Sequence, residues 1–270
     1  FQALIERQIA AGIAGIVPVG TTGESPTLDS DEHLAVIKAA VEFADGKIKV
    51  LAGSGANSTR EAIHLTQAAE AMGADASLQV CPYYNKPSQE GLYQHYKTVA
   101  ENTGLPIMLY SVPGRSVIEI GIETVARLAN DCENIVANKE AGGSVDRVNQ
   151  LVQAVPEDFQ ILSGDDPLTL PFMSCGAVGL VSVASNLIPE VMVSLVNRCL
   201  EGEYGEALEL QKRYYPLLSG LMSFDTNPVP IKSAVALQGH CTSELRLPLI
   251  PLSDEKTESL RGLLKTYGLL

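Results

Sequence analysis

A (β/α)8 barrel with a C-terminal helical extension is the α/β fold that the sequence predicts, on three observations. Apolar strand-like segments recur about every 20 to 35 residues, each followed by a helical pattern, as in parallel βα units. None of these segments runs into a GxGxxG or phosphate-binding loop, which an open nucleotide-binding sheet would carry. The chain also opens on a helix, so we expect the first barrel strand to lie upstream of residue 1.

Local signals define the expected elements in chain order. Leu4, Ile5 and Ile9 give the opening helix an apolar stripe, and Gly12 begins its exit. Seven strands are then expected, over residues 16–20, 49–55, 76–82, 106–112, 134–141, 159–163 and 177–184. The intervening helices have capping signals at Asp29 and Ser30, Ser58, Ser88, Ser144 and Asp166-Pro167. Ser58-Thr59-Arg60-Glu61 has the pattern of a capping box, in which Glu61 bonds back to the helix start.

The strand pattern stops at residue 203. Helical patterns then cover residues 207–221, 230–238 and 254–267. We therefore expect residues 1–202 to form the barrel and residues 203–270 to form a helical extension packed on it. With 46% hydrophobic residues and no Pro/Gly/Ser-rich linker, the chain can bury one large core.

Net charge and cysteine usage limit the partners and the kinds of site that we expect for this protein. A net charge of −13 argues against nucleic acid or an anionic membrane as partner. There is no apolar run long enough to span a bilayer and no leader pattern. The five cysteines are odd in number and unclustered, so we expect reduced thiols, no metal site and a cytoplasmic location.

The segment NIVANKEA, residues 134–141, places a lysine within an apolar strand. Ile135, Ala137 and Lys139 alternate onto one face, so in a closed parallel sheet Lys139 points inward. Burial lowers the pKa of an unpaired ammonium and leaves an amine that can attack a carbonyl. The alternative for this segment alone is a lysine that reaches solvent at the strand end or pairs with a carboxylate.

Polar residues follow several of the other strands. The turn Gly20-Thr21-Thr22-Gly23 can direct backbone N–H groups and two hydroxyls to an anion. Tyr84, Tyr110 and Arg115 stand at or after the next strand ends. Singly, each has a structural explanation as a turn, a core aromatic or a solvated cation. Together, at the C-terminal ends of barrel strands, they predict a nucleophilic amine with a proton-transfer phenol, a carboxylate cradle and a guanidinium clamp.

Six motifs resemble the dihydrodipicolinate synthase family, within the pyruvate-dependent class I aldolases and N-acetylneuraminate lyases. They are GTTGE at 20–24, PYYNKP at 82–87, YSVPGR at 110–115, NKEAGG at 138–143, SGDD at 163–166 and NPVPIK at 227–232. The motifs keep their order across essentially the whole chain. The resemblance implies a barrel whose first strand precedes residue 1.

The resemblance also implies a reaction and site roles. Lys139 would form an imine with pyruvate, and the derived enamine would add to L-aspartate 4-semialdehyde, with no cofactor. Tyr110, Thr22 and Tyr84 match the family's proton relay, Tyr84 reaching a neighbouring subunit's site. Thr21 and Thr22 would hold the pyruvate carboxylate and Arg115 that of the semialdehyde, while the Val181 backbone carbonyl would face the lysine. The implied assembly is a homotetramer of tight dimers.

Feedback inhibition by L-lysine is a further implication of the resemblance. The positions that match the family's effector site are Ser25, Pro26, His33, Asn57, Glu61 and Tyr83. Glu61 offers an acceptor for an ammonium, and Asn57 and Tyr83 offer donors for a carboxylate. Alternatively, Glu61 serves only the capping box and His33 is an ordinary helix residue. Ser30 stands where some relatives carry histidine.

Several positions depart from the family pattern. Ser116-Val117 replaces the usual Thr-Gly after the arginine, Cys81 a common threonine, and Asn138 an apolar residue. Two other functions are compatible with the fold. One is an aldolase or lyase for a sugar-derived 2-oxo acid, using the same imine; Arg115 argues against it. The other is a ligand-binding regulatory barrel, against which the full set of reactive residues argues.

Overall fold

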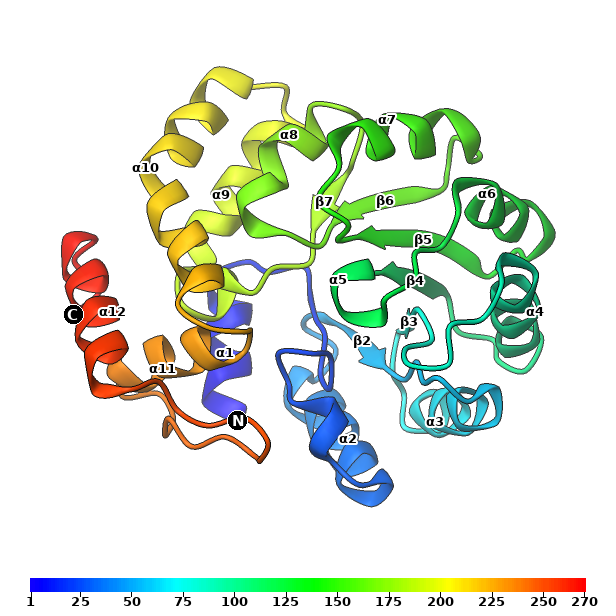
Figure 1. Ribbon diagram of the computed structural model, residues 1–270, viewed down its shortest axis with the longest axis horizontal. Helices are drawn as coiled ribbons and strands as arrows, with labels where there is room; N and C mark the ends of the chain where they lie inside the picture. The colour runs from blue at the N-terminus through cyan, green and yellow to red at the C-terminus, as the bar shows by residue number, and fades with distance from the viewer.

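Seven parallel strands form one sheet whose spatial order follows the chain order, in a structure that describes residues 1–270. In this computed structural model the strands are β1 Gly15–Ile16, β2 Lys49–Gly53, β3 Ala76–Val80, β4 Ile107–Ser111, β5 Ile135–Glu140, β6 Gln160–Ser163 and β7 Gly179–Leu180. The sheet curls inside a ring of helices (Figure 1). This is the predicted parallel barrel architecture, with seven strands.

The ring is built from the helices that precede, connect and follow the strands (Figure 1). They are α1 Gln2–Ala10, α2 Ser30–Ala44, α3 Thr59–Ala71, α4 Gln89–Ala100, α6 Ile122–Asp131, α7 Val145–Ala154, α8 Thr169–Met173 and α9 Pro189–Leu200. Shorter helical turns lie in the loops: η1 Ser25–Thr27, α5 Pro113–Ser116, η2 Asp166–Leu168 and η3 Ala184–Asn186. No helix is both long enough and apolar enough to cross a lipid bilayer.

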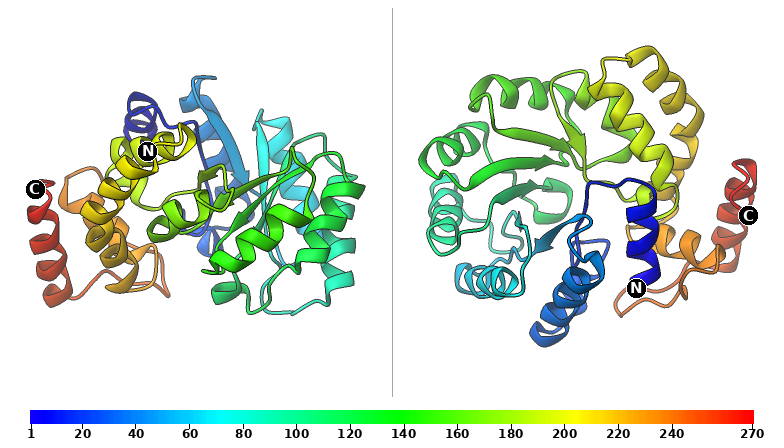
Figure 2. Two further views of the ribbon diagram at one scale, coloured as in Figure 1. Left: turned by 90° about the horizontal axis from the view of Figure 1, so that it is seen from above. Right: turned by 180° about the vertical axis from the view of Figure 1, so that it is seen from behind.

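Three further helices form the C-terminal part of the molecule. They are α10 Tyr204–Ser223, α11 Val229–Leu237 and α12 Asp254–Thr266. α10 packs on α8 and α9, and α12 packs on α11 and α10. In the turned view, α12 lies farthest from the strands, with α10 and α11 in between (Figure 2, left). The predicted helical extension is therefore present and joined to the ring through α10.

The main core lies between the strands and the surrounding helices. Leu109, Ile135 and Ile161 come from three neighbouring strands and are almost fully buried. They belong to one cluster with helix residues such as Leu128 and Leu151. Burying an aliphatic side chain of this size contributes about 1.5–3 kcal/mol each. The sheet is thus held in a fixed register, which sets the positions of its strand ends.

The two outer strands are shorter than the sequence predicts. Pro18 has no N–H to donate, so the strand expected over 16–20 ends at Ile16. At β7, the N–H groups of Val183 and Ala184 bond to the Asp166 carboxylate, at 2.9 and 3.2 Å, and not to a neighbouring strand. Side-chain chemistry, absent from the apolar pattern, ends the second strand.

The predicted helix starts at Ser58, Ser88 and Ser144 are confirmed, but the capping box expected at Ser58 is wrong. Ser88 and Ser144 accept bonds from Gly91 and Arg147, and Asp29 forms a capping box with Glu32. At Ser58, by contrast, no side-chain capping bond forms, so the capping box predicted with Glu61 is absent. The carboxylate of Glu61 is left exposed on the surface. The segment Pro113–Ser116, expected as a loop, forms one helical turn with proline at its first position.

Candidate active site

Lys139 and Tyr110 lie side by side at the ends of β5 and β4. The two residues are direct partners in the parallel register, so their side chains point to the same face of the sheet. The Lys139 Nζ is 4.1 Å from the centre of the Tyr110 ring. An aromatic ring over an ammonium supplies a weak attraction without a counter-charge. The inward-facing lysine predicted from strand alternation is therefore where the sequence analysis expects it.

Gly164 packs against the stem of Lys139. A Cβ atom at position 164 would lie 3.0 Å from Lys139 Cε and 3.1 Å from its Cγ. It would also lie 2.8 Å from the Cβ of Ala141, which directly follows β5. These distances are shorter than ordinary contacts, so any side chain at 164 would displace the lysine. The glycine of the SGDD motif thus fixes the path of the lysine side chain.

The environment of Lys139 favours the neutral amine. Although part of the side chain is accessible to water, desolvation by the surrounding protein lowers the pKa of Lys139 to about 8. The negative charge of Asp166 raises this pKa, and the positive charge of Arg115 lowers it further. A much larger share of neutral amine is therefore present near neutral pH than for an exposed lysine.

Asp166 is a buried carboxylate whose negative charge acts on Lys139. Burial raises the pKa of Asp166, while hydrogen bonds from the Ser182 hydroxyl and the backbone of Val183 and Ala184 lower it. Its oxygens are thus occupied by the β7 loop. Asp166 acts on Lys139 through its charge, without forming an ion pair with it. The lysine is left without a bonded carboxylate.

The Tyr110 phenol faces the Gly20–Gly23 turn. Burial raises its pKa, while a hydrogen bond with the Thr21 hydroxyl and the charge of Arg115 lower it. Thr21, and not Thr22, is therefore the threonine beside the phenol. Thr22 instead accepts a hydrogen bond from Asn227 Nδ2, at 2.9 Å. The structure brings both threonines to the site but gives them different partners.

Arg115 extends from α5 toward the same group of residues. Its Nη2 donates to the backbone oxygen of Asn227 at 3.1 Å. Two residues later, Val117 has a φ of 70°, in the left-handed region that a β-branched residue rarely adopts. This is the position where the family commonly has glycine, so the departure seen in the sequence corresponds to local backbone strain.

The C-terminal part braces the loop that carries the threonines. Lys232 of α11 contacts Glu24 with an Nζ–Oε1 distance of 2.5 Å, and the Arg246 backbone N–H donates to Glu24 Oε2 at 2.9 Å. Burial opposes the charge on Glu24, but Arg246 and Lys232 together lower its pKa below the usual value. The Arg246 side chain also forms a two-point contact with Glu32 at 2.7 Å. The extension is thus part of the site's framework.

A buried ion-pair network lies behind the lysine strand. Glu140 is fully buried and bonds to Arg147 Nε at 3.0 Å and to the Gly142 N–H at 2.8 Å. Arg147 also contacts Glu119 at 3.3 Å and donates to the Ile120 backbone oxygen. Burial raises the pKa of Glu140, and the Arg147 charge opposes this. Consecutive charged residues of β5 thus point to opposite sides of the sheet.

The tyrosine loop lies at the surface, apart from the lysine. Tyr84 is 89% exposed and has a φ of 74°, and Lys86 has a φ of 47°. The structure therefore does not bring Tyr84 against Lys139, Tyr110 or the threonines within this chain. Asn57 Nδ2 donates to the Tyr83 backbone oxygen at 3.1 Å, which fixes one side of the loop.

Several predicted effector residues gather around Tyr83. Burial and the charge of Glu61 raise the pKa of the Tyr83 phenol. Desolvation lowers the pKa of His33, whose Nε2 lies 2.8 Å from the Gly53 backbone oxygen, and Glu61 opposes this. Glu61 is therefore close enough to act on both. Ser25 and Pro26 lie in the neighbouring turn η1, beside the threonine loop.

Val181 follows β7 directly. Its N–H donates to the Ser163 backbone oxygen at 2.8 Å, which keeps it in the sheet one residue beyond the strand. β7 pairs with β6, the strand that leads into the Ser163-Gly164 turn, so Val181 lies beside that turn. No cluster of three His, Cys, Asp or Glu side chains suited to a metal ion is present.

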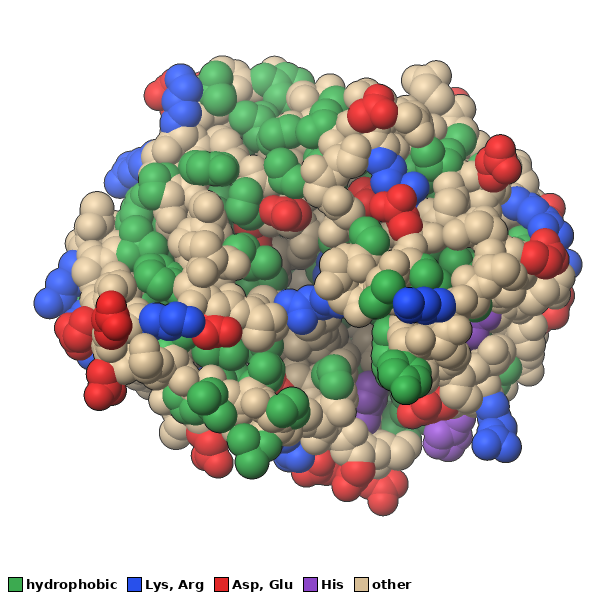
Figure 3. Space-filling model, in the orientation of Figure 1, with side chains coloured by type: hydrophobic (Ala, Val, Ile, Leu, Met, Phe, Trp, Pro, Cys, Tyr) green, Lys and Arg blue, Asp and Glu red, His purple; other side chains and the backbone are tan.

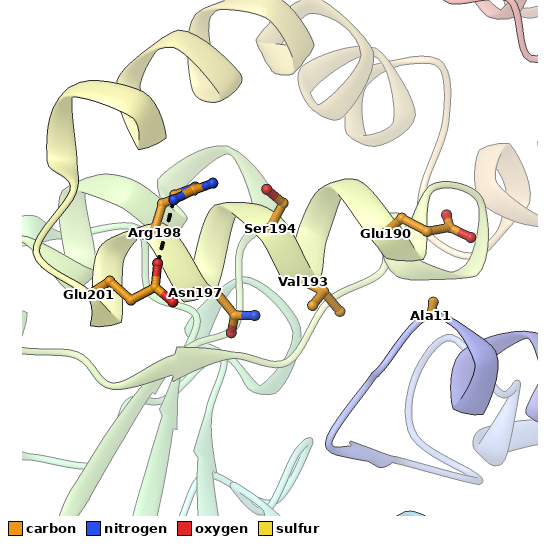
Figure 4. Close-up of a pocket in the computed structure, with 7 residues that line it drawn as sticks. All are labelled: Ala11, Glu190, Val193, Ser194, Asn197, Arg198 and Glu201. Carbon is orange, nitrogen blue, oxygen red and sulfur yellow. Dashed lines mark ion pairs between the residues drawn. The ribbon is translucent and has the colours of Figure 1, made fainter.

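The surface offers two contrasting hollows. Basic side chains line the hollow in the middle of the face shown in Figure 3. A second cavity, of about 330 Å³, lies between Ala11 and one side of α9 (Figure 4). Arg198 there pairs with Glu201 at 3.6 Å and Glu206 at 3.2 Å, so its charge is already satisfied. The groups with reactive chemistry lie at the strand ends.

Some residues of the site were not assigned by the sequence analysis. Asn227 and Lys232 lie in the quoted motif NPVPIK, but nothing local to that motif indicates a contact with residues 22 and 24. Gly164 and Asp166 lie in SGDD, which was read as a helix start. The available signal was the density of polar residues in both motifs, which exceeds what a cap or turn needs.

Comparisons with known proteins agree with this arrangement. The model of the dihydrodipicolinate synthetase family matches residues 1–267. The 4-hydroxy-tetrahydrodipicolinate synthase of Persephonella marina is 49% identical over 268 residues, covering 99% of this chain and 91% of the relative. The solved structure of the 4-hydroxy-tetrahydrodipicolinate synthase from Methylacidiphilum fumariolicum shares 54% identity with a TM-score of 0.97, covering 100% of this chain and 90% of that one. A dihydrodipicolinate synthase from Cyanidioschyzon merolae, solved with lysine bound, is 39% identical with a TM-score of 0.96, covering 100% and 91%.

Proposed function

The chain belongs to the dihydrodipicolinate synthetase family, and we propose how its own side chains condense pyruvate with L-aspartate 4-semialdehyde. The product of that condensation is 4-hydroxy-tetrahydrodipicolinate, on the route to diaminopimelate and lysine. The reaction uses a covalent imine between a lysine and pyruvate in place of a bound cofactor. The observation that carries the assignment of Lys139 is its position: it faces Tyr110 without a bonded carboxylate, and its pKa is lowered to about 8.

Lys139 is the nucleophile in this proposal. Its neutral amine attacks the ketone carbon of pyruvate, and loss of water gives a protonated imine. The cationic nitrogen withdraws electrons, so a methyl proton leaves and an enamine forms. The enamine carbon then bonds to the aldehyde carbon of the semialdehyde, and the aldehyde oxygen takes up a proton. The semialdehyde amine finally displaces Lys139 from the imine, which closes the ring and frees the lysine.

Tyr110 is the acid/base group. The Tyr110 ring lies beside the amine, and the Thr21 hydroxyl lowers the pKa of the phenol, which supports Thr21 as its relay partner. Thr22, expected from the resemblance to share that relay, has Asn227 as its neighbour and is better placed to hold the pyruvate carboxylate. The Val181 backbone carbonyl is proposed to accept a hydrogen bond from the substrate beside the lysine.

Arg115 binds the carboxylate of the second substrate. A guanidinium can hold a carboxylate by two parallel hydrogen bonds, and one Arg115 nitrogen is anchored on Asn227. Arg115 also lowers the pKa of Lys139 through its charge. Arg115 therefore has two roles: it binds the carboxylate of the second substrate, and its charge helps to keep Lys139 neutral.

Assembly extends the proposal beyond one chain. An aromatic side chain that is 89% exposed, in a loop with two left-handed residues, gains from being covered by another surface. We take Tyr84 to enter the site of a second copy, in tight dimers that pair into a homotetramer. A cytoplasmic location is also part of the proposal, consistent with five free cysteines.

Trapping with borohydride tests the nucleophile. Pyruvate and borohydride should attach one reduced pyruvyl group per chain, on the peptide that contains Lys139. Lys38→Ala, which alters an exposed lysine on α2, is the control and should label like the wild type. Labelling of another lysine, or unchanged labelling of Lys139→Ala, would refute the assignment.

Steady-state kinetics separate the clamp from the acid/base group. Arg115→Ala should still trap pyruvate but raise KM for the semialdehyde, losing about 2 kcal/mol of charge-assisted binding. Tyr110→Phe should instead lower kcat by about a hundredfold or more. The reverse pattern would exchange the two roles.

L-Lysine is the proposed effector, at the surface formed by Ser25, Pro26, His33, Asn57, Glu61 and Tyr83. A relative solved with lysine bound supports the idea, as does Glu61, whose expected capping bond is absent. Tyr83 adjoins Tyr84, so effector binding has a direct route to the loop. Millimolar L-lysine should inhibit the wild type and affect Glu61→Ala much less. An indifferent wild type would end the proposal.

A further inference from the structure

Asn227 lies between the groups proposed to bind the two substrates. Its side chain is 7% exposed, and Nδ2 donates to Thr22 Oγ1 at 2.9 Å. Its backbone oxygen accepts from Arg115 Nη2 at 3.1 Å. Thr22 is 205 positions away in sequence and Arg115 is 112 positions away. One residue of the loop between α10 and α11 thus touches both anion-binding groups through different atoms.

The chemistry of the two side chains fixes the direction of their hydrogen bond. An amide nitrogen can only donate, so the Thr22 oxygen must accept from Asn227. A threonine hydroxyl has one proton, and this bond does not use it. The proton therefore remains for another acceptor. A carboxylate can only accept, and the proposed pyruvate carboxylate needs a donor at this place.

We propose that Asn227 is a positioning residue that holds the Thr22 hydroxyl as a donor to the pyruvate carboxylate. Its main chain separately holds Arg115 for the second substrate. The inference rests on the proposed function, because it assigns a partner to the same threonine. No other side-chain bond holds the amide, since Asn227 Oδ1 has no partner in the protein. The amide is therefore held chiefly by the hydroxyl that it orients.

Asn227→Asp reverses the bond while keeping the shape of the side chain. A carboxylate at 227 cannot donate, so Thr22 would donate to it and lose its proton for pyruvate. The added negative charge would also repel the substrate anion. We expect KM for pyruvate to rise by about thirtyfold or more. Asn227→Ala leaves Thr22 free to rotate and should raise it about five- to tenfold.

The semialdehyde provides the internal control. All these variants keep the backbone oxygen at 227, so the Arg115 anchor is retained and KM for the semialdehyde should stay within about twofold. Asn130→Asp, which adds the same charge at an exposed site on α6, should match the wild type. A merely structural role would raise both KM values together and would overturn the proposal.

A double-mutant cycle with Thr22→Val completes the test. If Asn227 acts through the Thr22 hydroxyl, Asn227→Asp should lose most of its effect on KM for pyruvate once that hydroxyl is gone. An equal effect in both backgrounds, or equal effects of Asn227→Asp and Asn227→Ala, would overturn the proposal. If Asn227→Asp does not fold, the same cycle with Asn227→Ala decides. Labelling of wild-type Lys139 by pyruvate and borohydride reports on the proposed function whichever way Asn227 behaves.

Discussion

The two faces of β5 carry charged side chains with different bonded partners. On the inner side, Lys139 has an aromatic ring 4.1 Å away and no bonded carboxylate. On the outer side, the next residue, Glu140, is fully buried and bonded to Arg147 at 3.0 Å, with a backbone N–H as a further donor. One strand therefore carries an incompletely compensated charge and a fully compensated charge at consecutive positions.

The difference shows what separates a reactive charge from a structural one. Burial shifts the pKa of both groups toward the neutral form. At Glu140 the surrounding donors hold the carboxylate, so it ties β5 to α7 and to the segment before α6. At Lys139 no carboxylate is bonded and only the charges of Asp166 and Arg115 act, which leaves the amine free for the proposed reaction. The bonded partners of each group, more than its burial, therefore separate the two residues.

Replacing the inner charge should produce the largest functional change with little cost in stability. Lys139→Met keeps the length of the side chain and removes an ammonium whose burial is unfavourable. We expect turnover to fall by about a thousandfold or more, while the melting temperature stays equal or rises. Calorimetry and the coupled assay check this. A large loss of stability would mean that Lys139 is a structural charge like Glu140.

Breaking the ion pair between Glu140 and Arg147 should lower stability and leave the chemistry at Lys139 intact. Arg147→Ala leaves the Glu140 carboxylate buried without its partner and should lower the free energy of unfolding by about 3–5 kcal/mol. The protein that remains folded should still be trapped by pyruvate at Lys139. Glu140→Gln, which keeps a polar group of similar shape, should be milder. Denaturant unfolding and trapping yield measure the two effects, and loss of trapping without loss of stability would contradict the comparison.

A methyl group beside the inner charge should affect chemistry more than folding. Gly164→Ala would place a Cβ 3.0 Å from Lys139 Cε and push the amine aside. Displacing a reacting group by about an ångström can cost about a hundredfold in rate, and we expect kcat to fall by that order. Gly114→Ala, where no atom lies within 4 Å, is the matched control. Equal effects of the two variants would remove the proposed role of Gly164.

The pH dependence should reveal the charges around Lys139. Because its folded-state pKa is about 8, imine formation at low pyruvate should fall about tenfold per pH unit below that value and level off above it. Arg115→Gln removes a charge that lowers this pKa, so the profile should move to higher pH. Asp166→Asn removes a charge that raises it, so the profile should move to lower pH. Stopped-flow rates from pH 6 to 10 would show these shifts, and shifts of the same sign would contradict the assignment.

The smallest change in stability is expected from Val117, which lies between Arg115 and the residues that Arg147 contacts. Residues 115–120 run from Arg115 to the contacts of Arg147, and Val117 adopts a φ of 70° between them. Val117→Gly should relieve this conformation and raise the free energy of unfolding by about 1 kcal/mol, offset in part by the flexibility of glycine. KM for the semialdehyde should change little. A destabilised variant would show that the valine side chain contributes packing that outweighs the strain.

Much of the fold was predictable because it depends on periodic, local signals. Alternation from Ala137 to Lys139 placed the lysine on the inner face, and the repeating strand-helix pattern gave the parallel sheet. Ile135, expected on the same face, instead packs in the outer core, because the register with β4 shifts by one residue before Ala137. The ends of the outer strands were not predictable, because β7 stops where Asp166 captures its backbone N–H groups. That event depends on a side chain from another loop.

The contacts of the site were less accessible to sequence reasoning. The strand pattern does not show that Glu140 meets Arg147 on the next helix, or that Asn227 meets Thr22. At Ser58 the sequence predicts a contact that the structure does not contain. Ser-x-x-Glu is a capping pattern, yet the Ser58 side chain makes no such bond, and Glu61 lies near Tyr83 and His33.

The brace between the two ends of the chain also orders events during synthesis. The threonine turn is made early, whereas its partners Asn227 and Lys232 follow 205 and 208 positions after the residues they contact. Domains begin to fold from the N-terminus as the chain is made, and distant contacts form last. A nascent chain can therefore acquire the lysine strand before the threonine turn is held in place. We expect ribosome-bound chains that stop before residue 227 to trap pyruvate poorly, and chains that continue past residue 246 to trap it well. Synthesis of the segment that carries Asn227, Lys232 and Arg246 would then decide when the enzyme begins to work.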